Sequence, residues 1–129
     1  MLFRSAINVS SGDVVIMPSI NFISSFNIAK LTRAKVYLTD VDNKTGQMTP
    51  KNLIDCIKKN NLKKIKAVIT MYLGGSPEHI SSFNSLKKKY KFFWIEDACH
   101  AFGSSYFYKK NIKLDLVNMQ IYQHFRFIH

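Results

Sequence analysis

Four short apolar segments alternate with helix-like segments along this chain, and this alternation constrains the fold more than any other feature of the sequence. Strands are predicted over residues 13–17, 35–39, 66–71 and 92–96. Helices are predicted over residues 21–32, 49–60 and 78–90. Strands that alternate with helices favour a mainly parallel sheet joined by right-handed crossovers. The sequence therefore predicts an α/β fold.

Local signals mark where some of these elements begin. Thr49 followed by Pro50 predicts a helix N-cap with proline at the first helical position. Residues 76–78, Ser-Pro-Glu, predict the start of the next helix in the same way. Near the C-terminal end, residues 111–114 predict a short return strand after residues 104–108.

The end of the fourth predicted strand is a candidate site. Its apolar run stops abruptly at Glu96 and Asp97, and His100 follows within four positions. Apolar runs of this kind indicate a strand buried on both faces of a parallel sheet. Open α/β sheets bind their ligands just beyond the carboxyl ends of such strands. The residues alone leave two interpretations open, because the two carboxylates could instead cap the next turn.

Length and composition describe one globular domain or part of one. The chain has 129 residues, of which 47% are hydrophobic and 13% aromatic, as in a folded core. Its apolar runs are too short to span a bilayer, and its first residues do not form a secretory signal. Cys56 and Cys99 form neither a metal-binding pair nor a disulfide framework. A reducing, cytoplasmic setting is the simplest expectation, with no metal site.

The net charge of +11 raises the question of nucleic-acid binding. Most of the excess lies in residues 58–66 and 87–91, at predicted helix ends, where lysine faces the negative end of the helix dipole. Arginine, the residue preferred for phosphate and base contacts, is scarce. We favour a solvated basic surface. The alternative is a small basic α/β module that binds nucleic acid or anionic surfaces.

Taken together, five segments resemble the DegT/DnrJ/EryC1/StrS family of pyridoxal-phosphate sugar aminotransferases in order and spacing. They are Gly12–Ser19, Asn21–Asn27, Ala34–Asp42 with Thr45–Met48 behind it, Tyr72–Pro77 and Ile95–Gly103. No single segment is specific, but the ordered combination is. The resemblance covers residues 5–113, which is nearly the whole chain.

The resemblance implies a fold and an activity. The fold would be three-layered αβα, part of the large domain of a fold-type I pyridoxal phosphate-dependent transferase. The parent enzyme would be a homodimer that transfers an amino group, from glutamate, to a 4-keto-6-deoxy nucleotide sugar for polysaccharide or surface-glycan biosynthesis. Its partners would be that nucleotide sugar and glutamate, with neither membrane nor nucleic acid.

The resemblance also assigns cofactor-binding residues. Asp97 would hold the pyridine nitrogen protonated, and His100 would lie beside the phenolic oxygen of the cofactor. Phe22 would stack on the cofactor ring, near the same carboxyl rim of the sheet as Asp97. Ser24 would contact the ligand, although helix capping explains this residue equally well. For His100 and Phe22 the alternative is simple packing in the core.

Two parts of the family pattern have no match. The Schiff-base lysine is absent, so no catalytic residue is assigned. The segment that binds the cofactor phosphate at a helix N-terminus would precede residue 1. We therefore expect the chain by itself to be inactive and to retain the cofactor poorly.

Residues 114–129 resemble nothing in the family. Back-translated and read in a shifted frame, residues 113–129 give Ile-Gly-Ser-Cys-Lys-Tyr-Ala-Asp-Ile-Ser-Thr-Phe-Ser-Phe-His-Pro, which resembles the family's continuation ahead of its lysine. We expect a frameshift within residues 109–113, whose codons would be rich in adenine. The chain would then divide into a partial domain, 1–113, and an out-of-frame tail, 114–129, that packs poorly.

Overall fold

The computed structural model describes residues 7–101, 103–108, 112–115 and 125–128. The strands are β1 (Val14–Pro18), β2 (Lys35–Thr39), β3 (Ala67–Met71), β4 (Phe93–Asp97), β5 (Ser105–Tyr108), β6 (Ile112–Asp115) and β7 (Phe125–Ile128). The helices are α2 (Ile23–Leu31), α3 (Pro50–Lys59) and α4 (Ile80–Tyr90), with a 3₁₀ turn, η1, over Leu73–Gly75. The resemblance also implies a helix over Leu2–Ile7, of which all but Ile7 lies outside the described residues.

Five strands form one sheet in the order β2-β1-β3-β4-β7. The pairs β1–β2, β1–β3 and β3–β4 are parallel, whereas β7 runs antiparallel to β4. The four predicted strands are confirmed to within one residue at each end. The sequence did not predict β7, whose backbone pairs with β4 from Trp94 to Asp97.

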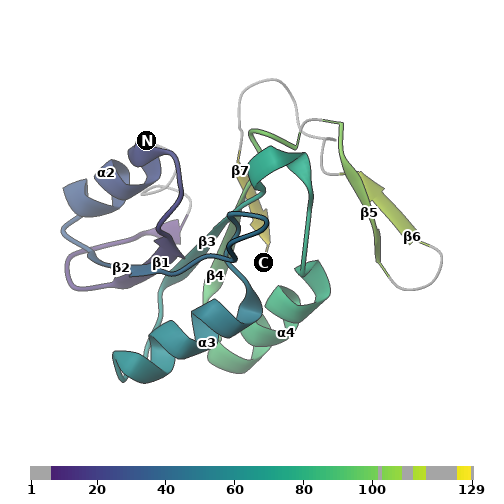
Figure 1. Ribbon diagram of the computed structural model, residues 1–129. Coiled ribbons are helices and arrows are strands. Elements are labelled where there is room, and N and C mark those ends of the chain that lie inside the picture. The colour runs from purple at the N-terminus through teal and green to yellow at the C-terminus, as the bar shows by residue number, and fades with distance from the viewer. Residues whose placement is uncertain (1–6, 102, 109–111, 116–124, 129) are drawn as a thin grey trace.

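The strand order explains why helices cover both faces of the sheet. The chain moves outward from β1 to β2 and then reverses, passing back over β1 to β3 and on to β4. Because each crossover is right-handed, a reversal of direction puts the next helix on the opposite face. Accordingly α2 lies on one side of the sheet, and α3 and α4 lie on the other (Figure 1). The predicted three-layer αβα arrangement is confirmed.

Alternate residues of the central strands fill two cores. Val15 and Met17 of β1 pack with Ala29 in the layer beneath α2. Ile16, between them in sequence, packs with Leu53 of α3 in the layer beneath α3 and α4. Both layers exclude solvent, which is why these strands read as continuous apolar runs rather than as alternating ones.

The start of α3 follows the local sequence signals. Thr49 is the N-cap, and its Oγ1 accepts from the backbone N–H of Asn52 at 3.2 Å. The side chain of Asn52 in turn accepts from the backbone N–H of Thr49 at 2.9 Å, which completes a capping box. Pro50 occupies the first helical position, as predicted.

The predicted start of α4 is wrong by about two residues. The helix begins at Ile80 rather than at residue 78, and its N-cap is His79, in a left-handed conformation without a side-chain cap. Ser76 is extended (φ −91°, ψ 115°), and its carbonyl accepts from a side chain on another loop, described below. A long-range contact therefore overrides the local Ser-Pro-Glu signal.

The predicted return strand is confirmed as a hairpin. β5 and β6 pair antiparallel, from Ser105 opposite Asp115 to Tyr108 opposite Ile112. The hairpin forms a separate two-stranded sheet and projects from the body of the molecule (Figure 1). It therefore contributes no strand to the main sheet.

Candidate functional site

The reversal of strand order creates a crevice at the carboxyl rim of the sheet. The chain leaves β1 toward α2 on one face and leaves β3 toward α4 on the other, so the connections diverge between these two neighbouring strands. Ligands of open α/β sheets bind at such switch points, beyond the carboxyl ends of the strands. The rim above β1, β3 and β4 is therefore the expected place for a site.

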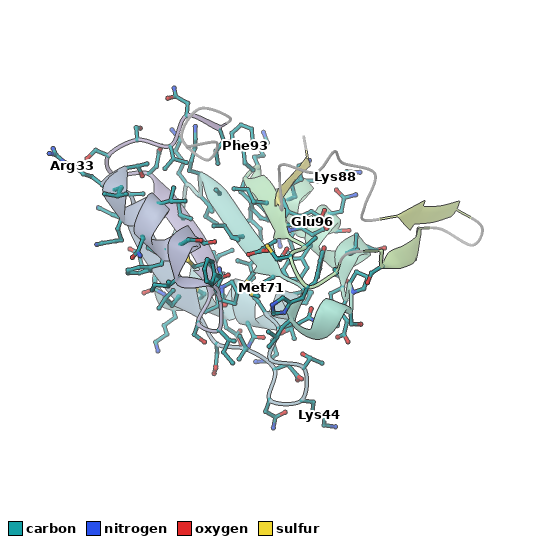
Figure 2. The ribbon with its side chains drawn as sticks, turned by 90° about the horizontal axis from the view of Figure 1, so that it is seen from above. Arg33, Lys44, Met71, Lys88, Phe93 and Glu96 are labelled. Atoms are coloured by element: carbon teal, nitrogen blue, oxygen red, sulfur yellow. The ribbon has the colours of Figure 1, made fainter. Side chains whose placement is uncertain are left out.

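A pocket of about 410 Å³ occupies this place. It is lined by residues that follow β1, end β3 or follow β4: Ile20, Asn21, Phe22, Met71, Leu73, Asp97, Cys99 and His100. Met71 and Asp97 lie opposite one another in the β3–β4 register, and in Figure 2 Met71 lies near the centre of the molecule. The walls are mainly apolar, with one carboxyl group and one imidazole among them.

Asp97 ends β4 and is 1% exposed, so its carboxyl group lies in the interior. Its Oδ1 accepts from the backbone N–H of Cys99 at 3.1 Å, and its own carbonyl accepts from the N–H of Tyr72 at 3.0 Å. The second bond joins the end of β4 to the residue just after β3. A buried carboxyl group without polar partners would be costly. The first bond fixes the side chain at the pocket, and the second fixes the backbone that carries it.

Cys99 is a neighbour that the sequence did not single out for the site. Burial and the adjacent Asp97 side chain raise the pKa of its thiol from 9.0 to about 12. The thiol therefore stays protonated at neutral pH. Cys99 is better placed to donate to Asp97 than to act as a nucleophile.

Phe22 lies at the mouth of the pocket as the N-cap of α2, with 64% of its surface exposed. The alternative of a core phenylalanine is therefore wrong. Its backbone N–H donates to Asn21 Oδ1 at 2.7 Å, which fixes the turn into the helix. Ser24 lies in the first turn of α2, half-buried, and does not line the pocket. It does not cap the helix either, because α2 has no side-chain cap bond.

His100 lies beside the pocket on the turn after β4, and its residue is exposed overall. The structure thus brings Phe22, Asp97 and His100 together at the carboxyl rim, where the sequence predicted Phe22 and Asp97 to meet. The sequence resemblance alone suggested their cofactor roles, and those roles stay a prediction.

Glu96 points away from this pocket. It is fully buried on the face that packs beneath α3 and α4, where the Tyr72 hydroxyl donates to its carboxylate. On the same face the Trp94 indole N–H donates to Thr70 Oγ1 at 2.9 Å. These two bonds tie β4 to β3 and its continuation. Glu96 therefore supports the strands that present Asp97.

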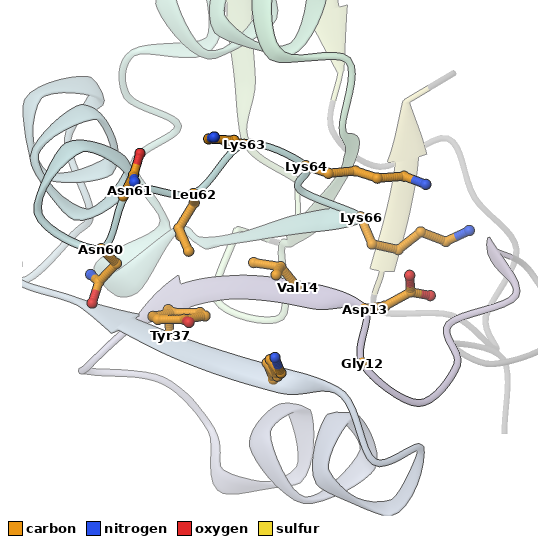
Figure 3. Close-up of a pocket in the computed structure, with 11 residues that line it drawn as sticks. Gly12, Asp13, Val14, Tyr37, Asn60, Asn61, Leu62, Lys63, Lys64 and Lys66 are labelled. Carbon is orange, nitrogen blue, oxygen red and sulfur yellow. The ribbon is translucent and has the colours of Figure 1, made fainter.

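A second hollow, of about 430 Å³, lies at the opposite, amino-terminal rim of the sheet. Its lining includes the side chains of Lys35, Lys63, Lys64 and Lys66. Figure 3 shows the Lys63 side chain extending one way, and the Lys64 and Lys66 side chains extending the other. Ammonium groups that diverge do not form a compact anion site. The hollow therefore gives no particular support to the nucleic-acid alternative.

The described residues contain neither a metal-binding cluster nor a membrane-spanning helix. Within these ranges no group of three or more metal-binding side chains is close enough to hold a metal ion. No helix in the same part of the chain is long and apolar enough to cross a membrane.

The pocket residues that sequence reasoning missed share one signal. Ile20, Asn21, Met71 and Leu73 all lie at or just beyond the carboxyl end of β1 or β3. The rule that places ligands at this rim could have found them once the strands were assigned. Which of them would line the pocket depends on loop conformation, which no local pattern specifies.

Comparisons with known proteins agree with this geometry. The chain is 37% identical over 101 residues to GDP-perosamine synthase of Escherichia coli O157:H7, an alignment that covers 78% of this chain and 27% of that protein. An aminotransferase structure from Psychrobacter cryohalolentis has a TM-score of 0.72 at 27% identity, covering 81% of this chain and 25% of that one.

A third comparison shows the fold alone. GDP-4-keto-6-deoxymannose-3-dehydratase, solved with a trapped PLP-glutamate geminal diamine, has a TM-score of 0.70 at 21% identity over 86% of this chain. The chain spans 25–29% of the length of these three proteins. The profile of the DegT/DnrJ/EryC1/StrS aminotransferase family matches residues 1–119, all but the last part of the chain. The chain therefore belongs to the DegT/DnrJ/EryC1/StrS aminotransferase family.

Proposed function

We propose that these residues form part of a pyridoxal phosphate-dependent aminotransferase that acts on a 4-keto-6-deoxy nucleotide sugar. Family membership supports amino transfer, and the similarity to GDP-perosamine synthase supports a nucleotide-linked sugar as the acceptor. The observation that carries the proposal is the meeting of Phe22, Asp97 and His100 at one pocket on the carboxyl rim. Glutamate as the donor and surface glycan as the destination belong to the same proposal.

The residues at the pocket fit this cofactor. Met71 and Leu73 offer apolar surface to a flat ring, and Phe22 offers an exposed aromatic face at the mouth. Asp97 supplies a buried carboxyl group for a basic ring nitrogen. Pyridoxal phosphate, when bound, supplies an electron sink for the carbon that carries the amino group.

The roles of the chain's own side chains follow from their positions. Asp97 is held by the Cys99 N–H and would keep a proton on the pyridine nitrogen, because burial strengthens the attraction between opposite charges. Phe22 would lose its exposure by stacking on the ring, which excludes water from one face. His100 would hydrogen-bond beside the phenolic oxygen and so orient the ring.

We also propose that these 129 residues do not catalyse transamination by themselves. Amino transfer on this cofactor requires a lysine amine as nucleophile and proton carrier. Among the described residues no lysine lines the pocket. The frameshift would account for this, because the shifted frame leads toward the family's lysine.

The DNA of the locus tests the frameshift directly. Past the codon for Lys113, a shifted frame should encode Ser-Phe-His-Pro and then a lysine and a glycine-rich stretch. Absence of this pattern from all three frames would overturn the frameshift, and with it the proposed continuation.

The longer enzyme, with its frame restored, tests the function. It should show a cofactor absorbance band and transfer an amino group from glutamate to a nucleotide-linked keto sugar. In it Asp97→Asn should lower turnover by about 100-fold or more, the size typical of removing one electrostatic partner. Asp55→Asn is the matched control, because Asp55 is an exposed carboxylate paired with Lys51 on α3. Equal turnover in the two variants would refute the role of Asp97.

The proposal extends to the setting of the parent enzyme, a homodimer in the cytoplasm. The free thiols of Cys56 and Cys99 are compatible with a reducing compartment. Sedimentation of the longer enzyme tests the dimer. The rival function, binding of nucleic acid, would instead appear as an affinity for DNA that falls steeply with salt.

A further inference from the structure

A buried glutamine joins two loops at the carboxyl rim. Gln47 lies on the loop between β2 and α3 and is 5% exposed. Its Nε2 donates to the carbonyl of Leu73 at 3.0 Å and to the carbonyl of Ser76 at 2.9 Å. Both acceptors belong to the loop between β3 and α4. A single carboxamide therefore clamps both ends of η1.

The backbone of Gln47 is itself held in place. Asp42 Oδ1 accepts from the N–H groups of Lys44 and Thr45. These bonds lower the pKa of Asp42, and the bond from Thr45 has the larger effect. The Asp42 N–H donates to the Gln47 carbonyl at 2.9 Å. The Gln47 N–H donates to Thr45 Oγ1 at 3.2 Å. The loop is thus ordered by its own bonds, which direct the Gln47 carboxamide toward the neighbouring loop.

The clamped loop in turn touches the pocket in two ways. Leu73 forms part of the pocket wall. Gly75 packs against the turn that carries His100, so closely that a Cβ on Gly75 would lie 2.7 Å from the His100 carbonyl oxygen. Ser104 Oγ donates to the Gly75 carbonyl at 2.8 Å and closes this contact. The loop therefore connects Gln47 to His100.

We propose that Gln47 is a positioning residue for the pocket. It holds the Leu73 wall directly, and it holds the His100 turn through Gly75. That the positioned residues serve a cofactor rests on the proposed function, whereas the mechanical link rests on the contacts alone.

The chemistry of the loop explains why an amide is needed there. Gly74 and Gly75 both have positive φ, 73° and 82°, so η1 has little local preference for its conformation. Without Gln47 two carbonyls would lose their donor, and the loop would relax toward other partners. A carboxylate at this position would face two carbonyl oxygens, so Gln47→Glu should disturb the loop more than Gln47→Ala.

Amide chemical shifts of the ¹⁵N-labelled 129-residue chain test the link. Gln47→Ala should shift the resonances of Gly75, His100 and Ser104. Asn52→Ala is the control, because it breaks the α3 capping box, another side-chain contact of the same region, and should shift Thr49 and residues of α3 but not His100 or Ser104. The proposal is overturned if Gln47→Ala leaves His100 and Ser104 where they are in the unaltered chain.

A second pair of variants keeps the test decisive if Gln47→Ala unfolds the chain. Gly74→Ala and Gly75→Ala impose similar backbone strain, but a Cβ on Gly74 meets nothing within 4 Å. Gly75→Ala alone should therefore displace the His100 turn. Equal shifts at His100 in both variants would contradict the link through Gly75.

These measurements separate the two proposals. They use the chain without cofactor, so unchanged shifts overturn the positioning role whatever the protein binds. Failure of the longer enzyme to transfer an amino group would instead overturn the proposed function and leave the mechanical link intact.

Discussion

Asp97 shows how one buried side chain alters the chemistry of its neighbour. The peptide N–H of Cys99 donates to its carboxylate, and the Cys99 thiol lies close enough for burial and Asp97 together to raise the thiol pKa to about 12. Cysteine reactivity follows the thiolate fraction. A residue that the sequence presents as an ordinary thiol is therefore unreactive at neutral pH.

Cys99 should resist alkylation although its residue is exposed. At pH 9 Cys99 should react with iodoacetamide about 100-fold or more slowly in the folded chain than in the unfolded chain, because a raised pKa lowers the fraction of the reactive thiolate. The stabilisation linked to this proton is complete below pH 9 and is lost as the pH rises toward 12. Mass spectrometry of labelled peptides measures the rate. Rapid labelling of folded Cys99 at pH 8 would contradict the raised pKa.

Tyr72 should stabilise the fold through its hydroxyl group. Tyr72→Phe removes a donor from the buried carboxylate of Glu96, so it should lower the free energy of unfolding by about 1–3 kcal/mol. Tyr37→Phe is the control, because Tyr37 is only half-buried at the sheet edge. Urea denaturation measures both. A loss no larger than that of the control would show that Glu96 does not depend on this bond.

At the scale of elements, periodic patterns carried most of the prediction. β1 to β4 and α2 to α4 were predicted because apolar periodicity and caps such as Thr49 are local properties. The start of α4 was not predicted correctly, because Gln47 on another loop holds the carbonyl of Ser76. Sequence resemblance suggested Asp97, Phe22 and His100 for the site. The strand assignment places Leu73 just beyond the carboxyl end of β3, but its position in the pocket wall depends on how η1 folds, which no local pattern specifies.

Replacing the C-cap residue of α4, Lys91, by glycine should stabilise the fold. Lys91 caps the helix in the left-handed conformation, with φ at 55°. Lys91→Gly should raise the free energy of unfolding by about 0.5–1 kcal/mol, since glycine adopts this conformation without steric cost. Lys88→Gly, in the last turn of the same helix, should instead lower it by about 1 kcal/mol. Thermal melts compare the two, and a loss of stability in both would contradict the capping argument.

At the scale of the whole molecule, β7 alters the expectation for the C-terminal segment. The prediction of an out-of-frame tail concerns the DNA, and it stays a prediction. The backbone of Phe125–Ile128 nevertheless pairs with β4 from Trp94 to Asp97. An unpaired strand edge is a template for association with another chain. β7 therefore shields β4 regardless of how its sequence arose.

Deleting residues 116–129 should expose that edge. The shortened chain should self-associate at concentrations where the full chain does not, because β4 would present unpaired N–H and C=O groups beside Phe93. Light scattering over a concentration series measures this. A shortened chain that stays monomeric and equally stable would show that β7 contributes nothing, in line with the expectation from the sequence alone.

The strand order also predicts the order in which the strands exchange their amide protons. β1, β3 and β4 are paired on both sides, whereas β2 and β7 are paired on one side only. Amide protons of the inner strands should therefore exchange with deuterium last, since their release requires opening of the whole sheet. Those of β2 should exchange early. Hydrogen exchange would thus proceed from the edge strands inward, and the strands that carry the pocket would exchange their amide protons last.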